Sequence, residues 1–194
     1  MDEAIEADRD KAHKRALVAI VDVPSQAYGR REEAYGIHQA LAGAVDAYAR
    51  ARLAGHAVIA LLVGKAMSGA FLAHGYQANR LIALRDPGVM VHAMGKAAAA
   101  RITLRSVDEL EALAASVPPM AYDLDNYASL GLLSQVLDVE QAVQPTAADL
   151  SRVKDALGSA LGDIAEAPRD LRGRLGAANR AASLQVREAL RAQW

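Results

Sequence analysis

Residues 57–79, AVIALLVGKAMSGAFLAHGYQAN, decide the fold, because they combine a short apolar run, a glycine-bounded turn and the start of a helix. Residues 58–63 are mostly branched and apolar and end at Gly64, which is typical of a strand buried in a parallel sheet. The small residues that follow let the first turn of a helix, with its unpaired N–H groups, approach another molecule closely. We therefore expect the amides of Ala66 and Met67 to open a helix and form an oxyanion hole for an acyl group.

The same turn has a second interpretation, in which its glycines serve only packing. Gly64 and Gly69 would then allow close contact between the strand and the helix, as in many α/β folds. Two phosphate-binding patterns are excluded, since the sequence contains neither G-x-x-x-x-G-K-[ST] nor G-x-G-x-x-G. The spacing alone leaves the oxyanion hole and the packing interpretation open.

The composition excludes several classes of function. The chain has 194 residues, 53% of them hydrophobic, and a formal net charge of −1, so it can bury a core but offers no positive charge for nucleic acid. No apolar run is long enough to predict a membrane span, and the charged first fifteen residues lack the apolar segment of a secretory signal. The absence of cysteine excludes disulfides, thiolate catalysis and cysteine metal ligands, and it fits a cytoplasmic location.

A second apolar, β-branched run covers residues 16–23 and ends at Pro24, which does not continue a central strand. From residue 32 to residue 53, apolar side chains recur every three or four positions, which predicts a long amphipathic helix that ends at Gly55. Strand, helix and second strand would form a right-handed parallel crossover. The loops after both strands would then lie at the same edge of the sheet.

The second half of the chain is predicted to be mostly helical. Two short strands are expected over residues 80–84 and 89–91, around a turn signal at residues 86–88. A short helix ending near Ile102 follows, then a helix opened by the capping box of Ser106 and Glu109, and a further helix over residues 130–137. We expect a core over residues 1–138 and a helical extension over residues 139–194 that packs on the core or on a partner.

Three motifs together resemble a known family. They are IVDVPSQAYGRREEAYG (20–36), GKAMSGAF (64–71) and VMVHAMGKAAAARI (89–102). GKAMSGAF resembles the carboxyltransferase pattern G-K-A-Y-G-G-A-Y, and DVPSQAYG resembles D-T-P-G-F-x-x-G. The match, from about Leu17 to Leu133, is to the carboxyl-terminal half of biotin-dependent carboxyltransferases and, more closely, to gamma subunits of biotin-independent malonate decarboxylase.

The resemblance implies an α/β fold of the ClpP/crotonase type, a spiral of β-β-α units, with an active site shared with a homologous beta subunit. It also implies decarboxylation of malonyl-S-acyl carrier protein to acetyl-S-acyl carrier protein, with the enolate held by backbone N–H groups. The implied partners are the beta subunit, the carrier protein with its phosphopantetheine-type group, and an acyl carrier transferase subunit. We expect no metal or cofactor on this chain, no nucleic-acid or membrane partner, and no activity from the chain alone.

Anion-binding candidates follow from the resemblance position by position. They are the amides of Ala66 and Met67 with the adjoining Ser68 and Gly69, and Ser25 and Gln26 in the first loop. Two departures from the family pattern affect the shape of the site: the glycine pair of the turn is Ser68-Gly69 here, and Ser25 replaces the glycine of the first loop. Family members usually have more sequence before residue 16, so the chain looks short at its front and is expected to rely on a partner for coverage.

His92 is the candidate proton donor, because it follows a predicted strand, although a neutral or structural histidine fits equally well. Lys65 and Lys96 are candidates to hold a malonyl carboxylate, against the default of a solvated lysine. The remaining substrate-binding candidates belong to the two loops: Gly64, Tyr28 and Gly29.

Two alternatives come from other classes of function. Ser68 at a helix start and His92 twenty-four residues later resemble the serine and histidine of Clp-type proteases, which would make the chain a serine hydrolase. The required acid would come from Asp123, Asp125 or Asp138, none of which lies in a recognisable motif. Alternatively, the chain is a non-catalytic structural subunit whose helical tail holds a catalytic partner.

Overall fold

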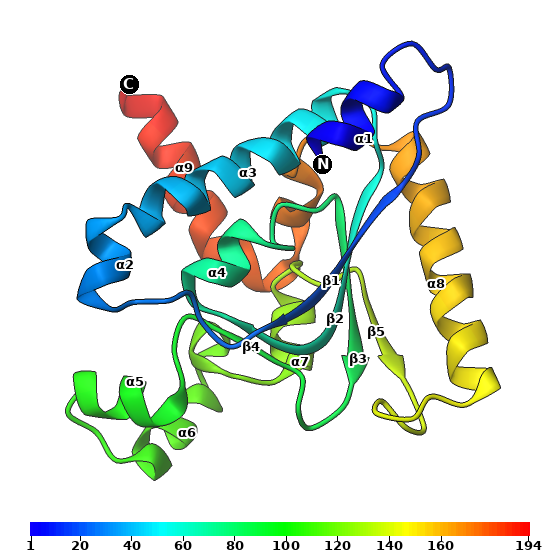
Figure 1. Cartoon of the computed structure of the whole chain (residues 1–194). Coiled ribbons are helices and arrows are strands. Elements are labelled where there is room, and N and C mark those ends of the chain that lie inside the picture. The colour runs from blue at the N-terminus through cyan, green and yellow to red at the C-terminus, as the bar shows by residue number, and fades with distance from the viewer.

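A parallel sheet organised around strand β2 (Val58–Met67) forms the centre of the molecule (Figure 1). The computed structural model describes residues 1–194 apart from the side chain of Pro118. On one side β2 pairs with β1 (Leu17–Val23) from Val58 to Ala66, with a register shift between Val21 and Val23. On the other side Ile59–Leu62 pair with β3 (Arg80–Arg85). The last three residues of β2 pair with β4 (Met90–His92), and β5 (Gln135–Asp138) extends the sheet beyond β3.

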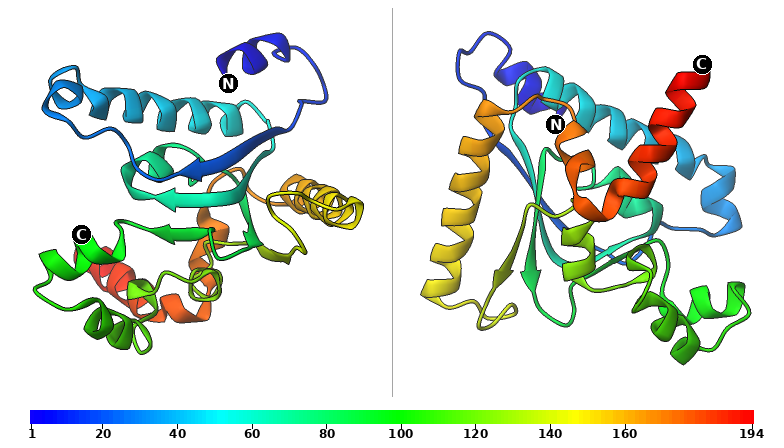
Figure 2. Two further views of the ribbon diagram at one scale, coloured as in Figure 1. Left: turned by 60° about the horizontal axis from the view of Figure 1, so that its bottom comes forward. Right: turned by 180° about the vertical axis from the view of Figure 1, so that it is seen from behind.

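Helices cover the sheet and extend from its edges (Figure 2). Helices α3 and α4 pack beside β1 and β2, whereas α8 packs along β3 and β5. The α-helices are α1 (Asp2–Ala7), α2 (Arg30–Ala34), α3 (Ile37–Leu53), α4 (Ser68–Ala73), α5 (Lys96–Ile102), α6 (Val107–Ala114), α7 (Leu124–Ser129), α8 (Ala147–Glu166) and α9 (Ala181–Gln193). Short 3-10 helices cover η1 (Pro118–Met120), η2 (Arg172–Gly176) and η3 (Ala178–Arg180). No described helix has the length and apolarity needed to cross a bilayer.

The apolar run of β2 forms the core of the protein. Val58, Ile59 and Leu62 have no exposed surface, because both faces of the strand are covered. Phe71 of α4 and Val21 of β1 pack in the same cluster. The core therefore fixes the end of β2 and the start of α4 relative to the first loop.

The structure confirms the predicted strands, with β2 continuing past Gly64 to Met67, and the capping box at Ser106, and it corrects two predicted helices. The helix expected over residues 32–53 is broken at Gly36, whose φ of 79° lies in the left-handed region and separates α2 from α3. The helix expected over residues 130–137 is absent. Gly131, with φ of 80°, lies just after α7, and residues 135–138 pair with β3 as an edge strand.

The C-terminal segment returns to the core after α8. Arg174 donates hydrogen bonds to the carbonyl oxygens of Tyr76, at 2.7 Å, and Ala78, just before β3. Arg174 also lies over the Tyr76 ring, with its guanidinium carbon 5.1 Å from the ring centroid. Helix α9, in contrast, has no buried residue. The boundary at residue 138 between core and extension stays a prediction.

Candidate functional site

The junction between β2 and α4 contains free backbone donors, two residues later than predicted. Ala66 and Met67 do not open a helix, because both are buried strand residues in register with Val91 and His92 of β4. The chain turns at Ser68, whose φ of 63° is unusual for a residue other than glycine. In the described part of the chain, no group accepts a hydrogen bond from the N–H of Ser68 or of Gly69.

The loop after β1 lies against this junction, as expected for two consecutive strands of a parallel crossover. The side-chain carbonyl oxygen of Gln26 accepts a hydrogen bond from the Ala70 N–H at 3.3 Å. The same oxygen faces Gly69, where an added Cβ would lie 3.4 Å from it. Ser25 donates its hydroxyl hydrogen to the Gln26 carbonyl oxygen at 2.8 Å, within the loop. Gln26 therefore occupies one N–H of the turn and leaves the two before it free.

Gly64 allows a second contact between the loops. An alanine Cβ at this position would collide with the carboxylate of Asp22, which accepts a hydrogen bond from the Lys65 N–H at 2.9 Å. This close approach is the packing role considered for the glycines of the turn. At Gly64, packing explains the glycine without a ligand.

A cavity of about 190 Å³ lies beside the free amides. It brings Ser68 and Gly69 together with His92, three of the candidates from the sequence. The remaining lining residues, Phe71, Leu72, Tyr76, Val91, Ala93, Tyr127 and Leu132, are apolar or aromatic. The geometry therefore places two backbone donors and one imidazole at a largely apolar cavity.

His92 is held by its neighbours at one ring nitrogen only. Its Nδ1 lies 3.1 Å from the Met94 carbonyl oxygen and 3.3 Å from the Met94 backbone nitrogen, and its ring stacks on Tyr122 with centroids 3.8 Å apart. In the described residues, Nε2 has no hydrogen-bond partner. Burial lowers the pKa of His92 below its ordinary value, so the neutral imidazole is favoured.

Tyr127 is a cavity residue that the sequence analysis missed. Burial, with smaller effects from Tyr122, Asp123 and Tyr76, raises the pKa of the Tyr127 phenol to about 12, so it stays protonated at neutral pH. It comes from α7, at the end of the predicted core. No local motif marks it, because its position depends on how α7 packs against β4.

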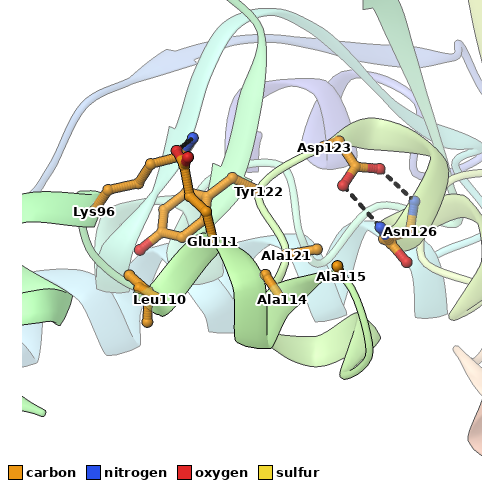
Figure 3. Close-up of a pocket in the computed structure, with 9 residues that line it drawn as sticks. All are labelled: Lys96, Leu110, Glu111, Ala114, Ala115, Ala121, Tyr122, Asp123 and Asn126. Atoms are coloured by element: carbon orange, nitrogen blue, oxygen red, sulfur yellow. Dashed lines mark hydrogen bonds and ion pairs between the residues drawn. The ribbon is translucent and has the colours of Figure 1, made fainter. Parts of the chain in front are cut away.

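The structure does not bring the other candidates to this cavity. Lys96 lines a neighbouring cavity of about 250 Å³, where its ammonium nitrogen is 2.7 Å from the Glu111 carboxylate (Figure 3). Lys65 is exposed, Tyr28 is 75% exposed, and Gly29 caps α2. The same figure shows Asp123 paired with Asn126.

A serine protease arrangement is not assembled among the described residues. No hydrogen bond joins Ser68 to His92 there, and the three candidate acids have other partners. Asp123 caps α7 through the Asn126 N–H at 2.9 Å, and Asp125 and Asp138 both bond Arg85. The described side chains also contain no group of three or more histidines or acids placed to hold a metal ion.

Comparisons with known proteins identify relatives along the whole chain. A family model described as the malonate decarboxylase gamma subunit matches residues 1–194. A malonyl-S-ACP:biotin-protein carboxyltransferase of Malonomonas rubra is 36% identical over 137 residues, which are 69% of this chain. The matched part is 47% of that protein, so the chain spans about half the length of this curated relative.

Solved structures show the same fold. The chain is 79% identical, with a TM-score of 0.93, to a chain of a Pseudomonas malonate decarboxylase hetero-tetramer in complex with coenzyme A, covering 100% of this chain and 73% of that one. It is 74% identical, with a TM-score of 0.89, to a chain of a Pseudomonas MdcD–MdcE hetero-dimer, covering 100% and 72%. Transcarboxylase 12S is similar in fold alone, at 23% identity and a TM-score of 0.59 over 86% of this chain and 30% of that one. The predicted crotonase-like α/β fold class is confirmed.

Proposed function

The chain belongs to the family of malonate decarboxylase gamma subunits, and on this premise we propose that it is the gamma subunit of a carboxy-lyase that acts on a malonyl thioester. The substrate is malonyl-S-acyl carrier protein and the product is the acetyl thioester. The Malonomonas relative is a malonyl-S-ACP:biotin-protein carboxyltransferase, and this supports a malonyl group on a carrier protein as the substrate class. The partner is a homologous beta subunit, in keeping with the hetero-dimer and hetero-tetramer of the Pseudomonas relatives.

The observation that carries the proposal is the pair of free amides at Ser68 and Gly69 beside the cavity. In the reaction, the bond between the carboxyl carbon and the α-carbon breaks, and its electron pair moves into the thioester to give an enolate. Charge therefore develops on the thioester oxygen. Backbone N–H groups aimed at that oxygen stabilise the transition state more than the ground state, without any titrating group.

Gln26 keeps the two donors in place. Because its side chain bonds the Ala70 N–H, the first loop and the turn form one unit, and an incoming thioester oxygen competes with no protein acceptor for the two preceding amides. Ser25 stabilises the backbone of the same loop. In this proposal Ala66 and Met67 act as the paired strand that positions the donors, and the role first expected of their amides passes to Ser68 and Gly69.

The enolate carbon then takes up a proton, and His92 is the group proposed to deliver it: after carbon dioxide has formed, the free Nε2 takes a proton from solvent and passes it to the carbon, so that the ring ends neutral as it began. His92 lines the same cavity as the amides, and its Nε2 is free. The released carbon dioxide needs no partner of opposite charge. The carrier protein would present the acyl group on a phosphopantetheine-type arm, and an acyl carrier transferase subunit would reload the carrier.

Reconstitution tests the proposal. The purified chain, the beta subunit and malonyl carrier protein should together release carbon dioxide and form the acetyl thioester, and the reaction should need both subunits. An equal rate with the beta subunit alone would instead indicate a structural role for this chain. Absence of carbon dioxide from the assembled complex would remove the decarboxylase proposal.

A further inference from the structure

The wall of the cavity beside Ser68 carries no charged side chain among the described residues, apart from the titratable His92. Five aliphatic or aromatic residues form most of it: Phe71, Leu72, Val91, Ala93 and Leu132. The polar groups are the Ser68 hydroxyl, two tyrosines and His92, and burial favours the neutral form of His92. A carboxylate that entered this cavity would therefore meet no fixed positive charge from this chain.

Among the described residues, no lysine or arginine side chain lines this cavity. Lys96 pairs with Glu111 in the neighbouring cavity, and Lys65 is exposed outside the lining. Arg174 does not line the cavity; its guanidinium lies over the Tyr76 ring and bonds the carbonyl oxygens of Tyr76 and Ala78. The lysines that the sequence suggested as holders of the malonyl carboxylate are thus not placed to hold it.

The size of the cavity fits only the reacting end of the substrate. Its volume of about 190 Å³ is below the range of about 300–1,000 Å³ that is usual for sites enclosing a whole drug-sized ligand. It is several times the roughly 30 Å³ that a water molecule occupies in the liquid. A carboxyl group fits, and the carrier arm has to lie outside.

We propose that this apolar cavity is the subsite that receives the carboxyl group of the malonyl thioester and releases it as carbon dioxide. The inference rests on the proposed function. An ionised carboxylate without a charged partner is destabilised in such a cavity, whereas carbon dioxide is neutral and apolar. As the carbon–carbon bond breaks, the negative charge moves from the carboxylate, which lies against the apolar wall, to the thioester oxygen at the Ser68 and Gly69 amides of the same cavity. The cavity therefore favours the transition state over the ground state.

The test adds a positive charge to the rim of the cavity from two sides. Ala93→Lys and Leu72→Lys change exposed rim residues of different elements, so folding should be preserved. Ala93→Met and Leu72→Met supply the same bulk without charge. Ile102→Lys, at a residue that is 66% exposed and outside the cavity lining, controls for net charge.

In the assembled complex, each lysine variant should lower KM for malonyl carrier protein and lower kcat about tenfold relative to its methionine counterpart, because ground-state stabilisation of the carboxylate is lost at the transition state. Inhibition by the acetyl carrier product, which has no carboxylate, should be the same in the lysine and methionine variants. Ile102→Lys should behave as the wild type.

Two results would overturn the inference. A higher kcat in either lysine variant would show that the carboxylate needs a cation at this position. Lysine variants that match their methionine counterparts in both kcat and KM would show that the carboxylate binds elsewhere or is neutralised by the beta subunit. Failure of the proposed function itself is distinguishable, because the wild-type complex would then release no carbon dioxide.

Discussion

Replacing Gly69 by proline tests the backbone donors directly. The substitution removes one of the two free N–H groups at the turn and adds no charge. Loss of a single donor of an oxyanion hole typically costs about 100- to 1,000-fold in kcat, or about 2.7–4 kcal/mol of transition-state stabilisation. We expect a loss of this size in carbon dioxide release by the assembled complex, measured at saturating malonyl carrier protein.

Gly69→Ala is the matched control, because it keeps the N–H. Its Cβ would meet the Gln26 side-chain oxygen at 3.4 Å, at the edge of ordinary van der Waals contact, so most of the activity should remain. Proline also restricts the residue before it, here the left-handed Ser68. Thermal unfolding and copurification with the beta subunit therefore have to show that Gly69→Pro folds and assembles.

Two outcomes would refute the reasoning. A folded Gly69→Pro complex with the wild-type kcat would show that this amide does not contact the developing charge. An equal loss in Gly69→Ala and Gly69→Pro would show that the position matters for shape and not for its donor.

Four further changes have defined outcomes. Ser68→Gly should raise the free energy of unfolding by about 1 kcal/mol, because it relieves the left-handed φ, and should keep decarboxylase activity; loss of activity, together with fluorophosphonate labelling of wild-type Ser68, would favour a serine hydrolase. Gly75→Ala should lower the free energy of unfolding by about 2–4 kcal/mol, since φ is 98° and the new Cβ would lie 2.5 Å from a Val21 methyl carbon. Backbone N–H groups hold the pKa of Asp149 at about 2. The folding stability that this carboxylate contributes is therefore complete above pH 3.8 and is lost as the pH falls through about 2. Asp149→Asn should weaken this acid dependence of the free energy of unfolding, measured in unfolding curves at several pH values. His92→Gln should lower kcat about 100-fold or more if His92 is the proton donor, and an unchanged rate would exclude it.

The strands were predictable because their signal is local. Branched apolar runs bounded by proline or glycine indicate β1 and most of β2. The apolar run of β2 is buried on both faces, whereas β1 buries only Ala19 and Val21 and leaves Val18 and Ile20 exposed. The end of β2 was predicted too early, at Gly64. That glycine is there for contact with Asp22, and pairing with β4 continues the strand to Met67. The pairing partner lies more than twenty residues later, so no local window contains this information.

The site was predictable in part for the same reason. The loop motifs identified the turn, Gln26 and His92, which the fold does bring together. The cavity wall from Tyr127 and Leu132 depends on how a late helix and the loop after it pack, which periodicity does not determine. Lys96 was placed near the site by its position in a motif, and its ion pair with Glu111 of α6 turns it away.

The hydrogen bonds of Arg174 make the reaction chamber depend on residues far along the chain. The guanidinium supports the peptide units at Tyr76 and Ala78, and the carbonyl oxygen of the same arginine lies where a side chain on Gly131, next to Leu132, would have to go. Tyr76 and Leu132 both line the cavity beside Ser68. Shortened versions of the protein that stop after α8 would therefore lose the brace behind that cavity wall, whereas versions that extend beyond η3 would keep it.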